Sequence, residues 1–245
     1  MFCNELILEV GRKCNLKCDH CLRGEAQDIE MSFETAKKAV DLCASGIGSL
    51  VFTGGEPMLY GCIINEIVNY IISQKISVSS FYVASNGIAY NPGVMNALVK
   101  LYAYCDEPEM CILDISTDHY HQLSYAELYG TKFAFKPHFN AFSFCSIKPD
   151  IEERYVLMEG RAKDWCDGGR YPDYNDTFGL DTDDDFKSVE MLYVTAKGDI
   201  SPECDWAFDT LDSLDLPSLN DIDTDEELID KLRAYNERVS ILFSV

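Results

Sequence analysis

The chain has 245 residues, 47% of them hydrophobic, so it can bury a core in one α/β domain or in a domain of about 160 residues with an appendage. Its 42 acidic and 20 basic residues give a net charge of -22, which would repel a polyanion and argues against a nucleic-acid partner. Its apolar runs are shorter than the roughly 20 residues of a membrane span, and no signal peptide is evident, so we expect a cytoplasmic protein.

Extended apolar segments alternate with helical patterns as far as residue 145, which is typical of βα units and a parallel sheet. Strands are predicted at residues 5–10, 49–53, 80–84 and 111–116, with two more at 137–145 and 153–158. Helices are predicted at residues 33–43, 62–73 and 92–102. Ser32 suits the cap of the first helix, and Pro92 suits the first turn of the third.

Past residue 160 the sequence changes character. Residues 189–195 and 199–202 predict a β-hairpin around Lys197-Gly198. Residues 209–223 are acidic and are predicted to be a linker. Thr224 and Glu227 form a capping-box pattern ahead of a final helix that ends near Val239. The sequence thus predicts two parts, residues 1–160 and 161–245.

Three of the eleven cysteines, Cys14, Cys18 and Cys21, have the spacing CxxxCxxC directly after the first predicted strand. Three thiolates on a short loop can hold three irons of a cubic iron-sulfur cluster and leave the fourth iron open. An open metal position indicates chemistry rather than a scaffold role. A zinc site or three unrelated buried thiols are the alternatives, but zinc knuckles favour paired CxxC units.

Polar or glycine-rich segments follow each of the next three predicted strands. They are Gly54-Gly55-Glu56-Pro57, Ser85-Asn86-Gly87 and Ser116-Thr117-Asp118. Because the carboxyl ends of parallel strands meet at one edge of a barrel, we expect these segments and the cysteines to share one rim. A tight turn is the alternative for the glycine pair, and turn or helix capping is the alternative for the short polar residues.

The cysteine spacing, with His20 before the third cysteine and GGEP one βα unit later, resembles the radical S-adenosylmethionine (radical SAM) superfamily. The resemblance implies a partial, open and trimmed TIM-type (β/α)6 barrel with a small C-terminal β-hairpin and helix extension. It also implies a [4Fe-4S] cluster, ligated by the three cysteines, and S-adenosyl-L-methionine (SAM). The residues that match its SAM-binding pattern are His20, Gly54, Gly55, Glu56, Pro57, Ser85, Asn86, Ser116, Asp118 and Arg161.

No catalytic residue is fixed by the sequence, and the candidates are His119, His121 and Arg161. A His-x-His string beside a strand end suits a rim loop that contacts substrate or solvent better than a second metal, because no matching carboxylate or cysteine spacing accompanies it. Arg161 lies in a Gly-Arg-Ala segment that resembles one late in many radical SAM barrels, where arginine grips a carboxylate of SAM or substrate.

Cys166 and the segment from Gly198 to Cys204 resemble the opening of the SPASM or twitch extension of peptide-modifying radical SAM enzymes. The match is partial, since no cysteine follows Cys204. An auxiliary iron-sulfur cluster would need Cys145 and another barrel cysteine as further ligands. The alternative is that Cys166 and Cys204 are ordinary buried thiols.

The resemblance implies an oxidoreductase-type radical enzyme in which SAM is cleaved by one electron to a 5'-deoxyadenosyl radical that takes a hydrogen atom from a substrate. A ribosomally made peptide is the favoured substrate, and a small molecule, as in deazapurine synthases, is the alternative. A glycyl-radical activase and a degenerate cluster-binding regulatory protein rank lower. The expected partners are the substrate and a reductant such as flavodoxin or ferredoxin.

Overall fold

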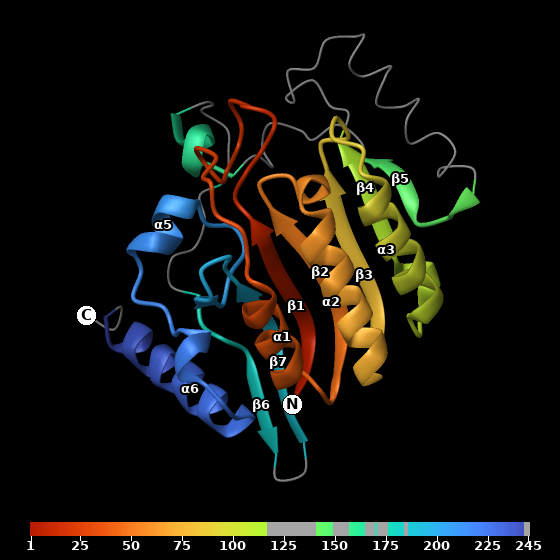
Figure 1. The fold of residues 1–245 in the computed structure, drawn as a ribbon. Helices are drawn as coiled ribbons and strands as arrows, with labels where there is room; N and C mark the ends of the chain where they lie inside the picture. Colours follow the sequence, from red (N-terminus) through yellow and green to blue (C-terminus); the bar gives the residue numbers. More distant parts are fainter. Residues whose placement is uncertain (117–140, 149–156, 165–169, 171–175, 184–185, 243–245) are drawn as a thin grey trace.

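The computed structural model describes residues 1–116, 141–148, 157–164, 170, 176–183 and 186–242. One mixed sheet of eight strands organises these residues, in the order β5-β4-β3-β2-β1-β7-β6, with β8 paired to β7 (Figure 1). The first five strands are β1 (Phe2–Gly11), β2 (Gly46–Gly54), β3 (Val78–Ser85), β4 (Ile112–Ser116) and β5 (Cys145–Lys148). Each pairs in parallel with the next, the arrangement that is expected of βα units.

Three helices cover one face of this sheet (Figure 1). They are α1 (Phe33–Leu42), α2 (Gly61–Gln74) and α3 (Pro92–Tyr104). Their apolar stripes pack on strand residues such as Leu6, Leu50 and Phe81 in the larger core cluster. The Ser32 hydroxyl accepts from Thr35 N at 3.0 Å and caps α1, as predicted.

The C-terminal part joins the same sheet. Strand β7 (Phe186–Val194) lies parallel to β1, and β6 (Leu180–Asp183) and β8 (Ile200–Ser201) pair with it antiparallel. The predicted hairpin at 189–202 is therefore present as β7 and β8. The final helix, α6 (Asp225–Leu242), begins at the predicted capping box, where Glu227 N donates to Thr224 Oγ1 and Thr224 N donates to Glu227 Oε2, both at 3.2 Å.

A smaller core cluster covers the opposite face of the sheet. It joins Ile7 of β1, Val51 of β2 and Tyr193 of β7 to Trp206 and Leu211. Leu211 belongs to α5 (Phe208–Ser213), which lies within the segment predicted to be an acidic linker. That prediction is wrong, because Leu211, Leu219 and Ile222 are all at most 2% exposed and the segment is packed into the fold.

Two other strand predictions differ from the structure. Of the strand predicted at 137–145, residues 137–140 lie outside the described residues, and within residues 141–148 the strand begins at Cys145, since residues 141–144 are not extended. Of the strand predicted at 153–158, residues 153–156 lie outside the described residues, and Leu157 forms an isolated bridge with Arg170. Within the described residues, no helix combines the length and the apolar character needed to cross a membrane.

Candidate active site

Residues 12–30, here called the cysteine loop, leave the carboxyl end of β1 and return to it. Arg12 N donates to Ile29 O at 2.9 Å, and Gln27 N donates to Arg12 O at 3.0 Å. Gly11 and Glu30 form an antiparallel bridge just outside these bonds. The loop is therefore closed at its base by main-chain hydrogen bonds, and its three cysteines lie between the two ends.

The three cysteines are at least partly buried, but their sulfur atoms are not clustered closely together. Cys18 is buried, and Cys14 and Cys21 are half-buried. Burial, assisted by nearby Glu56 and Cys21, raises the pKa of the Cys14 thiol, while the Leu16 amide acts against the shift. Among the described residues, the sole set of three potential metal ligands whose atoms lie within 4.8 Å of one another is elsewhere, at Glu203, Cys204 and Asp205.

The zinc and iron-sulfur hypotheses require different spacings of the three cysteine sulfurs. A single zinc ion with Zn–S bonds of about 2.3 Å would draw tetrahedral thiolates to within roughly 3.8 Å of one another. The Cys14, Cys18 and Cys21 sulfurs do not form so tight a set in the part of the chain that the structure describes. Three thiolates on one loop suit a larger, multi-iron cluster. The donor set therefore fits a [4Fe-4S] cluster.

The glycines of GGEP lie against the main chain at the base of the cysteine loop. Gly55 N donates to Gly11 O, and Glu56 N donates to Lys13 O, both at 2.9 Å. A Cβ at Gly54, whose φ is +134°, would lie 2.0 Å from Gly11 O, and one at Gly55 would lie 2.1 Å from Lys13 O. Only glycine allows so close an approach, so both glycines are needed to dock the second strand end on the loop.

The Glu56 carboxylate joins the second and third strand ends. It is 1% exposed and accepts from Met58 N at 3.0 Å, Ser85 Oγ at 2.8 Å and Asn86 N at 2.8 Å. Pro57 follows it at the start of a 3-10 turn. The Glu56 carboxylate thus holds Ser85 and Asn86 in place through these hydrogen bonds. A SAM contact from this segment would therefore come from its backbone.

Asn86 reaches from the end of β3 to the cysteine loop. Its Nδ2 donates to Asn15 Oδ1 at 2.9 Å and lies 3.9 Å from the Cys14 sulfur. Ser116, at the end of β4, is 7% exposed. Asp118, His119 and His121 lie outside the described residues. The structure therefore brings the first three predicted motifs together, and the fourth is represented by Ser116.

Arg161 contacts the cysteine loop from the other side. Its backbone N donates to Cys21 O, and its Nε donates to Cys18 O, both at 2.9 Å. Nη1 donates to Gly24 O and lies 3.5 Å from Glu25 Oε1. The arginine thus grips the loop that carries the cysteines and His20, and its predicted role toward a carboxylate of SAM or substrate stays a prediction.

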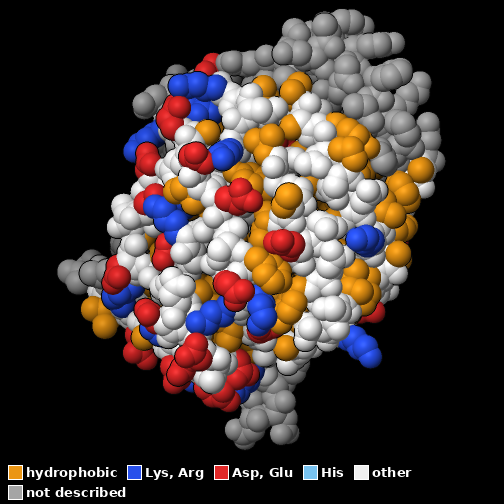
Figure 2. All heavy atoms as spheres, in the orientation of Figure 1, with side chains coloured by type: hydrophobic (Ala, Val, Ile, Leu, Met, Phe, Trp, Pro, Cys, Tyr) orange, Lys and Arg blue, Asp and Glu red, His pale blue; other side chains and the backbone are white. Residues whose placement is uncertain are grey.

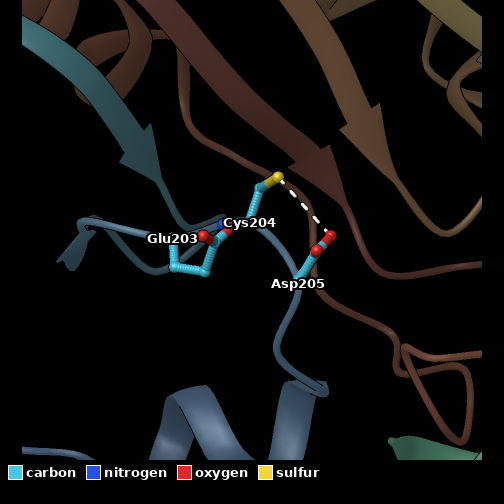
Figure 3. Close-up of side chains that lie close together, drawn as sticks. All are labelled: Glu203, Cys204 and Asp205. Carbon is cyan, nitrogen blue, oxygen red and sulfur yellow. Dashed lines mark hydrogen bonds between the residues drawn. The ribbon is translucent and has the colours of Figure 1, made fainter. Parts of the chain in front are cut away.

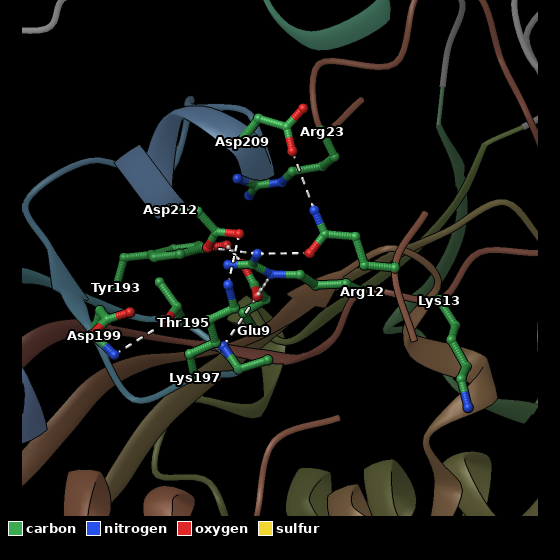
Figure 4. Close-up of polar contacts among 12 residues, drawn as sticks. Glu9, Arg12, Lys13, Arg23, Tyr193, Thr195, Lys197, Asp199, Asp209 and Asp212 are labelled. Atoms are coloured by element: carbon green, nitrogen blue, oxygen red, sulfur yellow. Dashed lines mark hydrogen bonds and ion pairs between the residues drawn. The ribbon is translucent and has the colours of Figure 1, made fainter. Parts of the chain in front are cut away.

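Sequence reasoning missed a polar cluster beneath the cysteine loop, in which the buried residues Glu9, Arg12 and Tyr193 meet the more exposed Asp212 (Figure 4). Glu9 and Arg12 have fully buried side chains, and Arg12 Nε donates to Glu9 Oε1 at 2.6 Å. Tyr193 OH donates to Glu9 Oε2 at 2.5 Å, and Arg12 Nη1 donates to Asp212 Oδ1 at 2.8 Å. The signal available in the sequence was two opposite charges three residues apart at the end of an apolar strand.

The set at Glu203, Cys204 and Asp205 is satisfied by its own contacts (Figure 3). Cys204 N donates to Glu203 Oε1 at 2.7 Å, and the Cys204 thiol donates to Asp205 Oδ1 at 3.8 Å. Arg170 pairs with the other Asp205 oxygen at 3.1 Å. Burial and the neighbouring Asp205 raise the pKa of Cys204 to about 12. These contacts describe a protonated thiol among acidic residues.

Cys145 and Cys204, both considered for an auxiliary cluster, are not brought together. Cys145 belongs to the core cluster under the helices, whereas Cys204 packs against the cluster on the opposite face of the sheet. Side chains on opposite faces of one sheet cannot share a cubic cluster. Cys166 lies outside the described residues.

A groove of about 850 Å³ lies on the outer face between α2 and α3, lined by residues such as Cys62, Asn65 and Lys100. Figure 2 shows this side of the molecule, with charged side chains crowded over α1 and α6 and more hydrophobic ones over α2 and α3. The groove is separated from the inner cluster around Ile7 and Tyr193 by the sheet itself. Its lining also includes Tyr60 and Glu30, and Glu30 is where the cysteine loop returns to β1, so the groove adjoins the base of that loop.

Comparisons with known proteins agree with this geometry. In solved structures, the fold is similar to anSMEcpe with bound AdoMet, with a TM-score of 0.58 and 16% identity over 100% of this chain and 81% of that one. It is also similar to Streptococcus suis SuiB bound to S-adenosylmethionine, with a TM-score of 0.50 and 13% identity over 96% of this chain and 68% of that one. At these identities the likeness shows the fold, an open partial TIM barrel.

Curated relatives match over shorter segments. An uncharacterized protein, MJ0907, of Methanocaldococcus jannaschii is 42% identical over 26% of this chain and 23% of its own length. The GTP 3',8-cyclase of Chlorobaculum tepidum is 32% identical over 33% of this chain and 25% of its own length. The chain thus spans about a quarter of the curated relatives it matches. The family model described as the radical SAM superfamily matches residues 8–136, more than half of the chain. This chain therefore belongs to the radical SAM superfamily.

Proposed function

We propose that this protein cleaves SAM reductively at a [4Fe-4S] cluster held by Cys14, Cys18 and Cys21, and that it uses the product to activate a substrate C–H bond. The observation that carries the proposal is the convergence of three strand ends on the cysteine loop. The loops after β1, β2 and β3 are joined by Gly55, Glu56 and Asn86 through direct hydrogen bonds.

When bound, the cluster and SAM supply a 5'-deoxyadenosyl radical, the species that takes a hydrogen atom from the substrate. The chain's own contribution is to position these groups. Asn86 and Arg161 hold the loop from opposite sides, at Asn15 and at the Cys18 carbonyl. Gly54 and Gly55 bring their backbone close to the main chain of Gly11 and Lys13, with no side chain between them.

A ribosomally made peptide is the proposed substrate class. The acidic balance of the chain, -22 overall, favours a peptide or another cationic substrate over an anionic one. The partial twitch resemblance of the segment that ends at Cys204 favours a peptide as well. The fold is similar to anSMEcpe with bound AdoMet and the Cp18Cys peptide, with a TM-score of 0.58 and 14% identity over 100% of this chain and 84% of that one.

A small-molecule substrate is the second candidate. The segment similar to the GTP 3',8-cyclase of Chlorobaculum tepidum favours it, as does a segment 35% identical to the AdoMet-dependent heme synthase of Nitratidesulfovibrio vulgaris over 30% of this chain and 21% of that one. The names of these two relatives indicate that they act on small metabolites. The shared segments cover a minor part of each enzyme, so they favour common cofactor chemistry more than a common substrate.

Anaerobic turnover with a chemical reductant tests the proposal. The reconstituted protein should form 5'-deoxyadenosine from SAM above the level of a Cys18→Ala variant, and equal levels in both would refute it. Adding a peptide encoded beside the gene should raise the rate and change the peptide's mass. A peptide that returns unchanged, while a nucleotide or porphyrin-type metabolite is consumed, would favour the small-molecule class.

A further inference from the structure

The base of the cysteine loop is built around Arg12, two residues before Cys14. Its backbone N–H and C=O close the loop on Ile29 and Gln27. Its Nη1 donates to Gln27 Oε1 at 3.0 Å, so the side chain also bonds the returning end of the loop. A shift of the Arg12 side chain would therefore displace both ends of the segment that carries the cysteines.

Besides the buried Glu9, Arg12 has a second carboxylate partner that comes from the far end of the sequence. Asp212 in α5 accepts from Arg12 Nη1 at 2.8 Å, and the guanidinium lies 4.7 Å from the ring centroid of Phe208 in the same helix. Lys197 Nζ lies 2.7 Å from the second Asp212 oxygen. A charge-assisted hydrogen bond to a fully buried guanidinium fixes orientation more strongly than an exposed ion pair does.

The segment around α5 contacts the cysteine loop at further points. Phe208 N donates to Arg23 O at 3.1 Å, and Arg23 Nη1 donates to Trp206 O at 2.8 Å. Gln27 Nε2 donates to Asp209 Oδ1 at 3.3 Å. Arg23 stands two residues beyond Cys21, so residues 206–212 hold the loop on both sides of the three cysteines.

The same segment is anchored independently of the loop. Glu159 is 3% exposed and accepts from Ala207 N at 3.3 Å and from the Thr210 hydroxyl. Trp206 and Leu211 are at most 2% exposed against β1, β2 and β7. Residues 206–212 are thus held by the sheet and by Glu159 as well as by the cysteine loop.

Stability alone is a poor explanation for this arrangement. The Asp212 side chain keeps 25% of its surface exposed, so solvent screens its ion pair with the buried Arg12 and the pair contributes little to the free energy of unfolding. What such a pair provides is a defined geometry. The position that is defined here is that of the loop whose thiols must face one cluster.

We propose that residues 206–212 form a brace for the cluster site, in which Asp212 acts as a positioning residue that holds the cysteine loop through Arg12. Residues 206–212 then belong to the cluster site, although none of them is among the expected cluster ligands. The proposal rests on the assignment of Cys14, Cys18 and Cys21 as cluster ligands.

Amide hydrogen exchange of the cluster-free protein tests the brace, and this measurement does not require an active enzyme. Asp212→Asn should speed exchange in residues 13–27 about tenfold, the effect of losing one charge-assisted hydrogen bond, and leave exchange in α2 unchanged. Glu226→Gln is the matched control, since it removes the same charge from an exposed pair with Lys187. It should match wild type. Unchanged exchange in 13–27 for Asp212→Asn would overturn the proposal.

Iron retention provides the second readout. After anaerobic reconstitution and desalting, Asp212→Asn should lose iron at least several-fold faster than wild type, and Asp212→Glu should recover part of the difference. If wild type binds no iron, the proposed function fails. If wild type binds iron and Asp212→Asn holds it equally well, the brace alone fails. Should Asp212→Asn not fold, Asp209→Asn removes the exposed contact to Gln27 and must show the same direction of change.

Discussion

Asn86 Nδ2 donates a hydrogen bond to Asn15 Oδ1 at 2.9 Å, and so ties the end of β3 directly to the loop that carries the three cysteines. The Asn86 backbone is in turn held by Glu56 from the loop after β2. The three strand ends therefore act as one unit, with Glu56 as the joint. Disturbing this carboxylate should affect the cysteine loop even though Glu56 is not among the expected cluster ligands.

Glu56→Gln tests the joint. The substitution replaces a buried carboxylate that accepts from Ser85 and Asn86 with an amide that presents a donor to one of them. We expect the free energy of unfolding to fall by about 1–3 kcal/mol, measured by urea denaturation of the cluster-free protein. Glu66→Gln, on the exposed face of α2, makes the same charge change and should stay within about 0.5 kcal/mol of wild type. Equal effects from the two variants would contradict the assigned role.

Gly55→Ala tests the close approach between GGEP and the loop. The new Cβ would lie 2.1 Å from the Lys13 carbonyl oxygen, so the loop must move. We expect lower iron content after reconstitution and less 5'-deoxyadenosine from SAM, with a loss of stability of roughly 1–3 kcal/mol.

Gly93→Ala is the matched control for this variant, because Gly93 lies in the first turn of α3 and alanine is the better helix former. Its new Cβ would meet the side chain of Asn91, at 3.1 Å, rather than backbone. It should retain wild-type iron content and turnover. An active Gly55→Ala variant with full iron content would contradict this prediction, because it would show that the loop accommodates the added Cβ.

Cys145 offers a pH-dependent test of the core assignment. Burial, assisted by Asp114, raises the pKa of its thiol to about 12, so almost no thiolate is present near neutral pH. Because the thiolate is the reactive form, the alkylation rate of Cys145 should rise about tenfold per pH unit from pH 7 to pH 10 without levelling off. Peptide mapping by mass spectrometry measures the rate. The unfolded protein should level off near pH 8.5, and a folded protein that does the same would place Cys145 in solvent.

The sequence predicted the regular elements well because their hydrophobic periods are simple. The Ser32 cap, Pro92 at the start of α3 and the Thr224–Glu227 capping box are local signals, and each marks a helix start in the structure. The shared rim of the first three motifs was also predictable, since it follows from parallel strand order alone.

The C-terminal segment was harder to predict. Its frequent aspartates suggested a linker, yet Phe208 and Leu211, three residues apart, bury one side of α5 while Asp212 meets a buried arginine. That pairing joins residues 200 positions apart, and no local period reports it. The parallel pairing of β7 with β1 is likewise set by tertiary contacts. The two-part division at residue 160 stays a prediction.

Iron and sulfide quantification after anaerobic reconstitution, combined with EPR, tests the central claim most directly. The comparison is between wild type and a variant with Cys14→Ala, Cys18→Ala and Cys21→Ala together. The account predicts about four irons per chain in wild type, a reduced-cluster signal that changes when SAM is added, and almost no iron in the variant. Iron and signal retained in the variant would contradict it, because the cluster would then lie away from the loop on which the three strand ends converge.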